Sequence, residues 1–251
     1  KGEIIDATPL NGKVILNYDD PNVDTWIERA GGRTIAKFSG LNSSADYFAS
    51  NVHFSSEGTM KFDLNTPLGS QSINLALLGN HNVLNAVAAA AASMEAGADL
   101  REVKTGLEIL KPVSGRLFPT QGINQCRVID DSYNASPSSF RAAIDVFKNL
   151  SGTKILVAGD MRELGVKSDE FHRQVGRYAA SSGIERLWAI GEHSRHMVAD
   201  FGSGAKHFSS KDELINECRE TAKRGFVFLI KGSRGSRMDS IANALRVREG
   251  D

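Results

Sequence analysis

The feature that most constrains the fold is the regular alternation of short apolar runs with longer amphipathic segments after residue 112. The apolar runs are rich in strand-forming residues and lie at 127–129, 155–158, 187–190 and 226–230. Segments of helical period follow them near 137–149, 168–181, 211–223 and 236–246. Short strands that are apolar throughout are typical of parallel sheets covered by helices. The pattern therefore predicts an α/β fold with a mostly parallel sheet and flanking helices.

The first part of the chain has a different order. β-branched or alternating patterns predict strands at 14–17, 34–38, 45–54, 59–64 and 72–77. Apolar residues at helical spacing predict helices at 81–95 and 100–110. A Lys-Pro-Val-Ser-Gly break at 111–115 separates the two patterns, so we expect one domain at 1–112 and a second at 113–251.

Composition excludes several classes of protein. Lys plus Arg and Asp plus Glu both number 30, so there is no charge bias of the kind that nucleic-acid or membrane-surface binding favours. Cys126 and Cys218 are far apart, which indicates neither a disulfide framework nor a zinc site. No segment approaches the roughly 18 apolar residues of a membrane span. We expect a cytoplasmic protein without nucleic-acid or membrane partners.

Three loops follow predicted strands, at 130–137, 159–165 and 231–234, and all are rich in charge, amide or glycine. Open α/β sheets bind ligands outside the carboxyl ends of their strands. The adjacent Asp130 and Asp131 are expected to divide roles between ligand and structure, while Ser136 and Pro137 predict a helix start. Two cations and two glycines at 231–235 precede a predicted helix and favour anion binding.

Two further segments carry candidate ligand groups. Asn82 and Asn85 lie three residues apart, on one side of a predicted first helical turn, where carboxamides suit a purine or a ribose. A helix cap and a surface residue are the alternative. Arg116 offers a donor fork for phosphate, or is a solvated linker residue. His172 is expected only to hydrogen-bond a neighbour.

Taken together, the segments 79–85, 115–118, 130–135, 159–165 and 231–234 resemble, in order and spacing, the motifs of the Mur ligases. The resemblance covers essentially the whole chain. It implies that 1–112 is the C-terminal part of a central ATP-binding domain, and that 113–251 is a Rossmann-like domain that binds an amino acid or dipeptide. The Asp-Asp-Ser-Tyr-Asn-Ala and Lys-Gly-Ser-Arg forms are most similar to the branch that joins D-alanyl-D-alanine to UDP-N-acetylmuramoyl-tripeptide.

The resemblance implies that ATP converts the tripeptide carboxylate into an acyl phosphate, which the dipeptide amine then attacks. It assigns catalytic roles to Arg116, Asp131 and Lys231. The implied nucleotide-binding residues are His81, Asn82, Asn85, Arg116 and Asp131. The implied substrate-binding residues are Tyr133, Asn134, Asp160, Glu163, Lys231, Ser233 and Arg234. Ser136 replaces an Asn that many relatives carry, which we treat as a tolerated cap variant. A monomer is expected.

The sequence contains no G-x-x-x-x-G-K-[ST] phosphate loop and begins at Lys1 without a methionine. We interpret it as a truncated piece, inactive alone, with the main Mg²⁺ ligands upstream. The two domains are expected to close on a shared ligand, with Arg116 near the pivot. The alternatives are a sister ligase with another acceptor, including one that adds glutamate to folate, and a non-enzymatic binding module.

Overall fold

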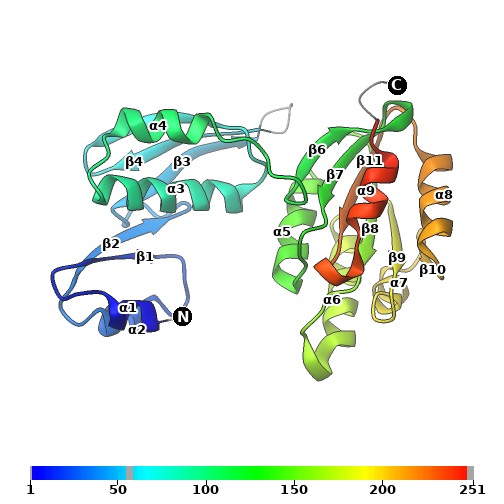
Figure 1. Cartoon of the computed structure of the whole chain (residues 1–251), viewed down its shortest axis with the longest axis horizontal. Coiled ribbons are helices and arrows are strands. Elements are labelled where there is room, and N and C mark those ends of the chain that lie inside the picture. The colour runs from blue at the N-terminus through cyan, green and yellow to red at the C-terminus, as the bar shows by residue number, and fades with distance from the viewer. Residues whose placement is uncertain (1, 55–58, 248–251) are drawn as a thin grey trace. The chain divides into compact units, whose positions relative to one another are not determined.

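The computed structural model describes residues 2–54 and 59–247. Lys1, the first residue of the piece interpreted above as truncated, lies outside the described residues. The chain divides into two compact units, Lys1–Lys111 (unit 1) and Pro112–Asp251 (unit 2), each with its own sheet and helices (Figure 1). The predicted α/β class is confirmed. Within the described residues, no helix combines the length and the apolar character needed to cross a membrane.

Unit 1 contains a mixed sheet with the strand order β1-β2-β3-β4-β5. The strands are β1 (Lys13–Asn17), β2 (Thr34–Ser39), β3 (Tyr47–Phe54), β4 (Met60–Thr66) and β5 (Gly69–Leu75). β1, β2 and β3 pair in parallel, whereas β4 is antiparallel to β3 and β5. The turn between β4 and β5 contains Pro67 and Leu68, and proline is favoured in such turns because its φ is already fixed.

The core of unit 1 lies between this sheet and α3 (Asn80–Glu95), with α4 (Leu100–Glu108) packed beside it. Alanines along the buried face of α3 allow its backbone to approach the sheet closely. Phe62, Leu64 and Ile73 are fully buried in this cluster. Two shorter helices, α1 (Glu3–Ala7) and α2 (Val23–Ala30), pack against each other, and α2 also contacts β1.

Unit 2 contains a sheet with the order β10-β9-β8-β11-β7-β6. The strands are β6 (Phe118–Gln121), β7 (Arg127–Asp131), β8 (Thr153–Gly159), β9 (Arg186–Ile190), β10 (Ala205–Phe208) and β11 (Phe226–Lys231). All neighbours pair in parallel except β6, which is antiparallel to β7. β8 and β11 are buried along most of their length, which explains their continuous apolar runs.

Helices cover both faces of the unit 2 sheet (Figure 1). They are α5 (Pro137–Phe147), α6 (Ser168–Ser181), α7 (Arg195–Phe201), α8 (Lys211–Thr221) and α9 (Asp239–Leu245). α8 and α9 share one apolar core with the sheet, while α5 and α6 lie on its other side. As predicted, α5 begins with Pro137 at its first position and Ser136 as its cap, which accepts a hydrogen bond from the Ser139 amide at 3.2 Å.

Several elements differ from the sequence-based expectation. The helices α1, α2 and α7 and the strands β6 and β10 were not predicted, because they are only four to eight residues long. The helix predicted at 236–246 begins only at Asp239, since Arg237 has a left-handed backbone (φ 51°) that ends a preceding 3₁₀ turn, η3 (Arg234–Ser236). The helix predicted at 100–110 ends at Glu108, and the strand predicted at 72–77 spans Gly69–Leu75.

Two helical glycines give a matched test of the packing. A Cβ at Gly176 in α6 would lie 2.2 Å from the carbonyl oxygen of Met197, whereas a Cβ at Gly106 in α4 meets no atom within 4 Å. We expect Gly176→Ala to lower the free energy of unfolding of unit 2 by about 1–3 kcal/mol. Gly106→Ala is expected to raise that of unit 1 by about 0.5–1 kcal/mol. Urea denaturation measures both, and equal effects of the two changes would contradict this packing.

Candidate functional site

Three of the predicted loops meet because β11 lies between β7 and β8 in the sheet. Lys231, the last residue of β11, is in register with Asp131 of β7 and with Ala158 of β8. The carboxyl ends of parallel neighbours point to the same edge of a sheet. The segments 130–137, 159–165 and 231–236 therefore lie together at one edge, which we call the carboxyl edge.

Lys231 is a buried brace at the carboxyl edge. Its side chain is 2% exposed, and its Nζ donates to Asp131 Oδ2 at 2.6 Å and to the Asn134 carbonyl oxygen at 3.0 Å. The ammonium also lies 5.4 Å from the centre of the Phe140 ring. A buried ammonium requires such compensation. The sequence predicted Lys231 as a residue that contacts ligand, and the structure places its amine among groups of the protein.

The adjacent aspartates both have partners within unit 2. Asp130 accepts from the Ser132 hydroxyl at 2.6 Å and from Arg246 Nη2 at 2.5 Å. Asp131 accepts from the Leu117 amide at 3.1 Å through the carboxylate oxygen that does not face Lys231. The two carboxylates thus hold β7 to Arg246, at the end of α9, and to the segment that leads into β6. The expected division into one structural and one ligand-facing carboxylate is not visible in these contacts.

The exposed part of the carboxyl edge is cationic and aromatic. Tyr133 is 45% exposed, and the guanidinium carbons of Arg116 and Arg234 lie 4.5 Å and 5.4 Å from the centre of its ring. The Gly115 carbonyl accepts from the Tyr133 amide at 3.0 Å, which brings the segment carrying Arg116 to this ring. Two guanidinium groups held at one ring favour an anionic ligand, because the planar guanidinium matches the oxygens of a carboxylate or a phosphate.

A third guanidinium lies at the same edge. The Arg162 guanidinium packs against the bare backbone of Gly235, where a Cβ would come within 2.4 Å of it. Glu163 follows with a left-handed backbone (φ 62°) and is exposed, as is Arg162. Arg162 was not singled out from the sequence, because only the folded chain brings its loop to the 231–236 segment.

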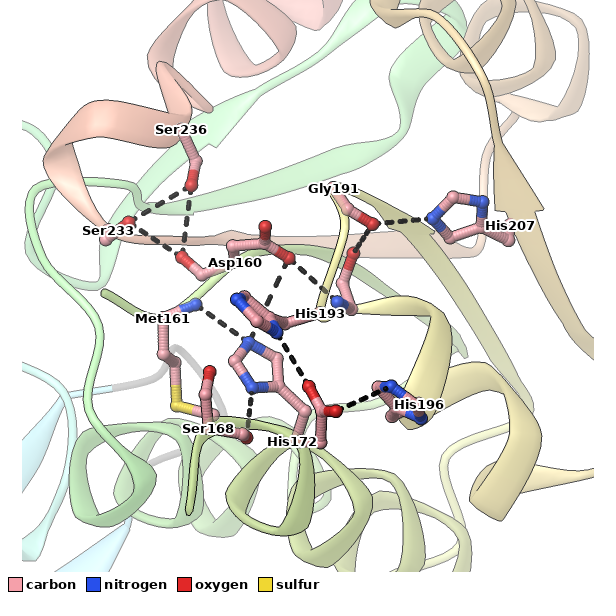
Figure 2. Close-up of polar contacts among 12 residues, drawn as sticks. Asp160, Met161, Ser168, His172, Gly191, His193, His196, His207, Ser233 and Ser236 are labelled. Atoms are coloured by element: carbon pink, nitrogen blue, oxygen red, sulfur yellow. Dashed lines mark hydrogen bonds and ion pairs between the residues drawn. The ribbon is translucent and has the colours of Figure 1, made fainter. Parts of the chain in front are cut away.

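Asp160 joins several loops at once (Figure 2). One carboxylate oxygen accepts from the Ser194 amide at 2.7 Å, and the backbone carbonyl accepts from the Ser233 and Ser236 hydroxyls at 2.7 Å and 3.0 Å. Gly191 permits this approach, since a Cβ there would lie 2.4 Å from the same carboxylate oxygen. No sequence motif indicated Ser194 or Gly191. Ser236 ends the 231–236 motif, where its Ser-x-x-Ser spacing from Ser233 was the available signal.

In unit 1 the predicted residues lie at the start of α3. Asn82 and Asn85 are on the same side of the helix, with Asn85 Nδ2 3.4 Å from Asn82 Oδ1, as the spacing predicts. Asn82 also donates to the Leu78 carbonyl at 2.8 Å. His81 lines an open pocket of about 590 Å³ together with Asn80, Leu84 and residues from β3 and two loops. This turn presents amides beside an open, partly apolar surface.

Among residues 2–54 and 59–247, no group of three or more His, Cys, Asp or Glu side chains is arranged to hold a metal ion.

The brace predicts a large effect of one substitution. Lys231→Ala removes the buried ammonium that lies 2.6 Å from the Asp131 carboxylate, so we expect the free energy of unfolding of unit 2 to fall by about 3 kcal/mol. The exposed Lys167 is the matched control, and Lys167→Ala is expected to change it by less than about 0.5 kcal/mol. Chemical denaturation of unit 2 measures the difference; similar values for both variants would show that Lys231 is not a brace.

Comparison with known proteins adds the family. The model of the Mur ligase middle domain matches residues 1–93, and that of the Mur ligase glutamate ligase domain matches residues 115–234. The chain is 40% identical over 248 residues to the UDP-N-acetylmuramoyl-tripeptide--D-alanyl-D-alanine ligase of Escherichia coli K12, covering 98% of this chain and 54% of that protein. The enzyme of the same name from Haemophilus influenzae is 38% identical over 254 residues, with the same coverage.

A solved structure agrees. The crystal structure of MurF from Acinetobacter baumannii superposes with a TM-score of 0.88 at 32% identity, covering 97% of this chain and 53% of that one. The chain thus spans about half the length of the relatives it matches. Both domain models and these relatives agree with the motifs at the carboxyl edge and on α3, and the chain belongs to the Mur ligase family.

Proposed function

We propose that this chain works as part of an ATP-dependent amide ligase of peptidoglycan precursor synthesis. The ligase joins D-alanyl-D-alanine to the carboxylate of UDP-N-acetylmuramoyl-tripeptide. ATP phosphorylates that carboxylate, the dipeptide amine attacks the resulting acyl phosphate, and inorganic phosphate leaves. A free carboxylate is a poor acyl donor, and the phosphoryl group makes one of its oxygens a leaving group. The protein contributes alignment and neutralisation of charge.

The observation that carries the proposal is the exposed pair of guanidiniums on Tyr133, in a chain whose relatives bear this ligase name. Every reacting group except the amine is anionic: a carboxylate, a triphosphate and an acyl phosphate. Arg116 and Arg234 present planar donors that match phosphate and carboxylate oxygens. The buried Lys231 adds positive charge at the same edge, and its ammonium donates to Asp131 and to the Asn134 carbonyl.

The attacking amine needs an acceptor for its ammonium form. Asp160 uses one carboxylate oxygen for the Ser194 amide, its side chain is 19% exposed, and the exposed Glu163 follows three residues later. We assign these two carboxylates to the amine end of the dipeptide. The Arg234 guanidinium is assigned to the carboxylate of the dipeptide or to the acyl phosphate. Asn134 is exposed and Ser233 is buried. Asn134 is assigned to the dipeptide, and Ser233 acts through the turn that carries Arg234.

For the nucleotide, we assign the asparagine pair of α3. Asn82 and Asn85 offer amide donors and acceptors that suit the edge of adenine, and His81 lines the neighbouring pocket. Arg116 is assigned to phosphate. Asp131 is assigned to the ribose of the nucleotide. Its carboxylate also accepts from Lys231 and from the Leu117 amide.

The reaction is tested on the full-length protein to which this chain belongs. With ATP and UDP-N-acetylmuramoyl-tripeptide, we expect phosphate release that depends on D-alanyl-D-alanine and is at least about a hundredfold slower with single D- or L-amino acids. A coupled phosphate assay, with mass detection of the amide product, measures this selectivity. Faster turnover with a single amino acid or with glutamate would assign the chain to a sister ligase.

Tyr133 provides a test at the level of one side chain. Tyr133→Ala removes the ring that holds Arg116 and Arg234, so we expect kcat/KM for ligation to fall about tenfold, in line with partly exposed cation–π contacts. Tyr133→Phe keeps the ring and is expected to stay within about twofold. Equal losses in both variants would assign the effect to the hydroxyl instead of the ring.

A further inference from the structure

We infer that His172 is a positioning residue of the carboxyl edge: it holds the Asp160–Met161 peptide in the orientation that secures the turn bearing Arg234. The identity of the ligand in this inference rests on the proposed function. The contacts that support it lie entirely within unit 2 (Figure 2).

His172 is fully buried, and both of its ring nitrogens have a hydrogen-bond partner. Its side chain is 0% exposed; Nδ1 lies 2.7 Å from the Ser168 carbonyl oxygen, and Nε2 lies 3.0 Å from the Met161 amide nitrogen. A carbonyl requires a donor and an amide requires an acceptor. The ring is therefore neutral, with its proton on Nδ1, and Nε2 accepts from Met161.

The opposite end of the same peptide group holds the 233–236 turn. The Asp160 carbonyl oxygen accepts from the Ser233 amide at 3.0 Å, from the Ser233 hydroxyl at 2.7 Å and from the Ser236 hydroxyl at 3.0 Å. A peptide group is planar, so its N–H and C=O directions are fixed relative to each other. A rotation that released Met161 from His172 would therefore turn the carbonyl away from both serines.

The charges around His172 determine what protonation does. From the loop after β8, Asp160 Oδ1 lies 3.9 Å from Nε2; from the segment before α7, the His193 ring centre lies 5.5 Å away. On α6 itself, Asp169 is 2.7 Å from His193 Nδ1 and 3.3 Å from His196 Nε2 of α7. Burial lowers the pKa of His172, so the neutral, accepting form is retained at neutral pH.

Protonation would place an N–H donor opposite the Met161 N–H and draw the ring towards the Asp160 carboxylate. The pKa of His172 is lower in the folded chain than in the unfolded chain. The stability that the neutral His172 contributes is therefore complete above the ordinary histidine pKa, and it is lost as the pH falls through the pKa of the folded chain. The order of the Arg234 turn is lost over the same range.

The chain offers a matched pair of uncharged substitutions. His172→Gln places an amide oxygen where Nε2 accepts from the Met161 amide, and the glutamine side chain does not titrate. His172→Asn is shorter and keeps only a donor for the Ser168 carbonyl. In the full-length protein at about pH 7.5, we expect His172→Asn to raise KM for D-alanyl-D-alanine about tenfold with a smaller change in kcat. His172→Gln is expected to stay within about twofold, and the rise in KM that we expect for the wild type as the pH falls below the ordinary histidine pKa is expected to be absent in this variant.

Amide hydrogen exchange gives a readout that does not depend on ligation. We expect His172→Asn to reduce protection of the Met161 and Ser233 amides, and His172→Gln to retain it. His53→Gln in β3 of unit 1 is the control and changes neither exchange nor KM. Thermal melts verify folding; if His172→Asn does not fold, the pH profile of His172→Gln carries the test.

The outcomes separate the two claims. Identical exchange and KM in the Asn and Gln variants, or a wild-type acid rise in KM that persists in His172→Gln, overturns the positioning role. If the full-length protein shows no ligation while Ser233 protection follows the expected pattern, the positioning role stands and the proposed function fails.

Discussion

The arrangement of the carboxyl edge depends on the pairing of β11 with β7 on one side and β8 on the other. This pairing buries the end of β11 and puts Lys231 in register with Asp131, so the ammonium meets a carboxylate where water is excluded. The same carboxylate accepts from the Leu117 amide and so joins the segment bearing Arg116 to the sheet. One ion pair at a strand end therefore orders loops that are far apart in the sequence.

The central strands were predictable because burial on both faces leaves continuous apolar runs in β8 and β11. The edge strands were not. β6 contains Pro119 and alternates with polar residues, and β10 is short, with Lys206 and His207 exposed; their pairing is set by their neighbours instead of by their own sequence. The late start of α9 has a local cause, since the left-handed backbone of Arg237 follows from the turn that Asp160 holds.

The location of the candidate site was predictable because its loops follow predicted parallel strands, whereas the tasks of single residues were not. A lysine in a Lys-Gly-Ser-Arg loop indicates a ligand contact, but whether its amine faces solvent depends on Asp131 and Asn134, which precede it by about a hundred residues. His172 was expected to hydrogen-bond a neighbour, as it does, but the sequence could not identify its partners, because they are a backbone carbonyl and a backbone amide. Side-chain direction at such positions follows from tertiary contacts.

A division of labour results at the carboxyl edge. The groups that fix its loops are backbone amides and carbonyls, hydroxyls, a neutral imidazole and glycines that allow close approach, as at Gly191 and Gly235. The groups that face outwards are Arg116, Tyr133 and Arg234, and their side chains carry little of that framework. Exchange of an outward side chain therefore alters the recognised ligand at small structural cost, whereas a change in the framework displaces all of them together.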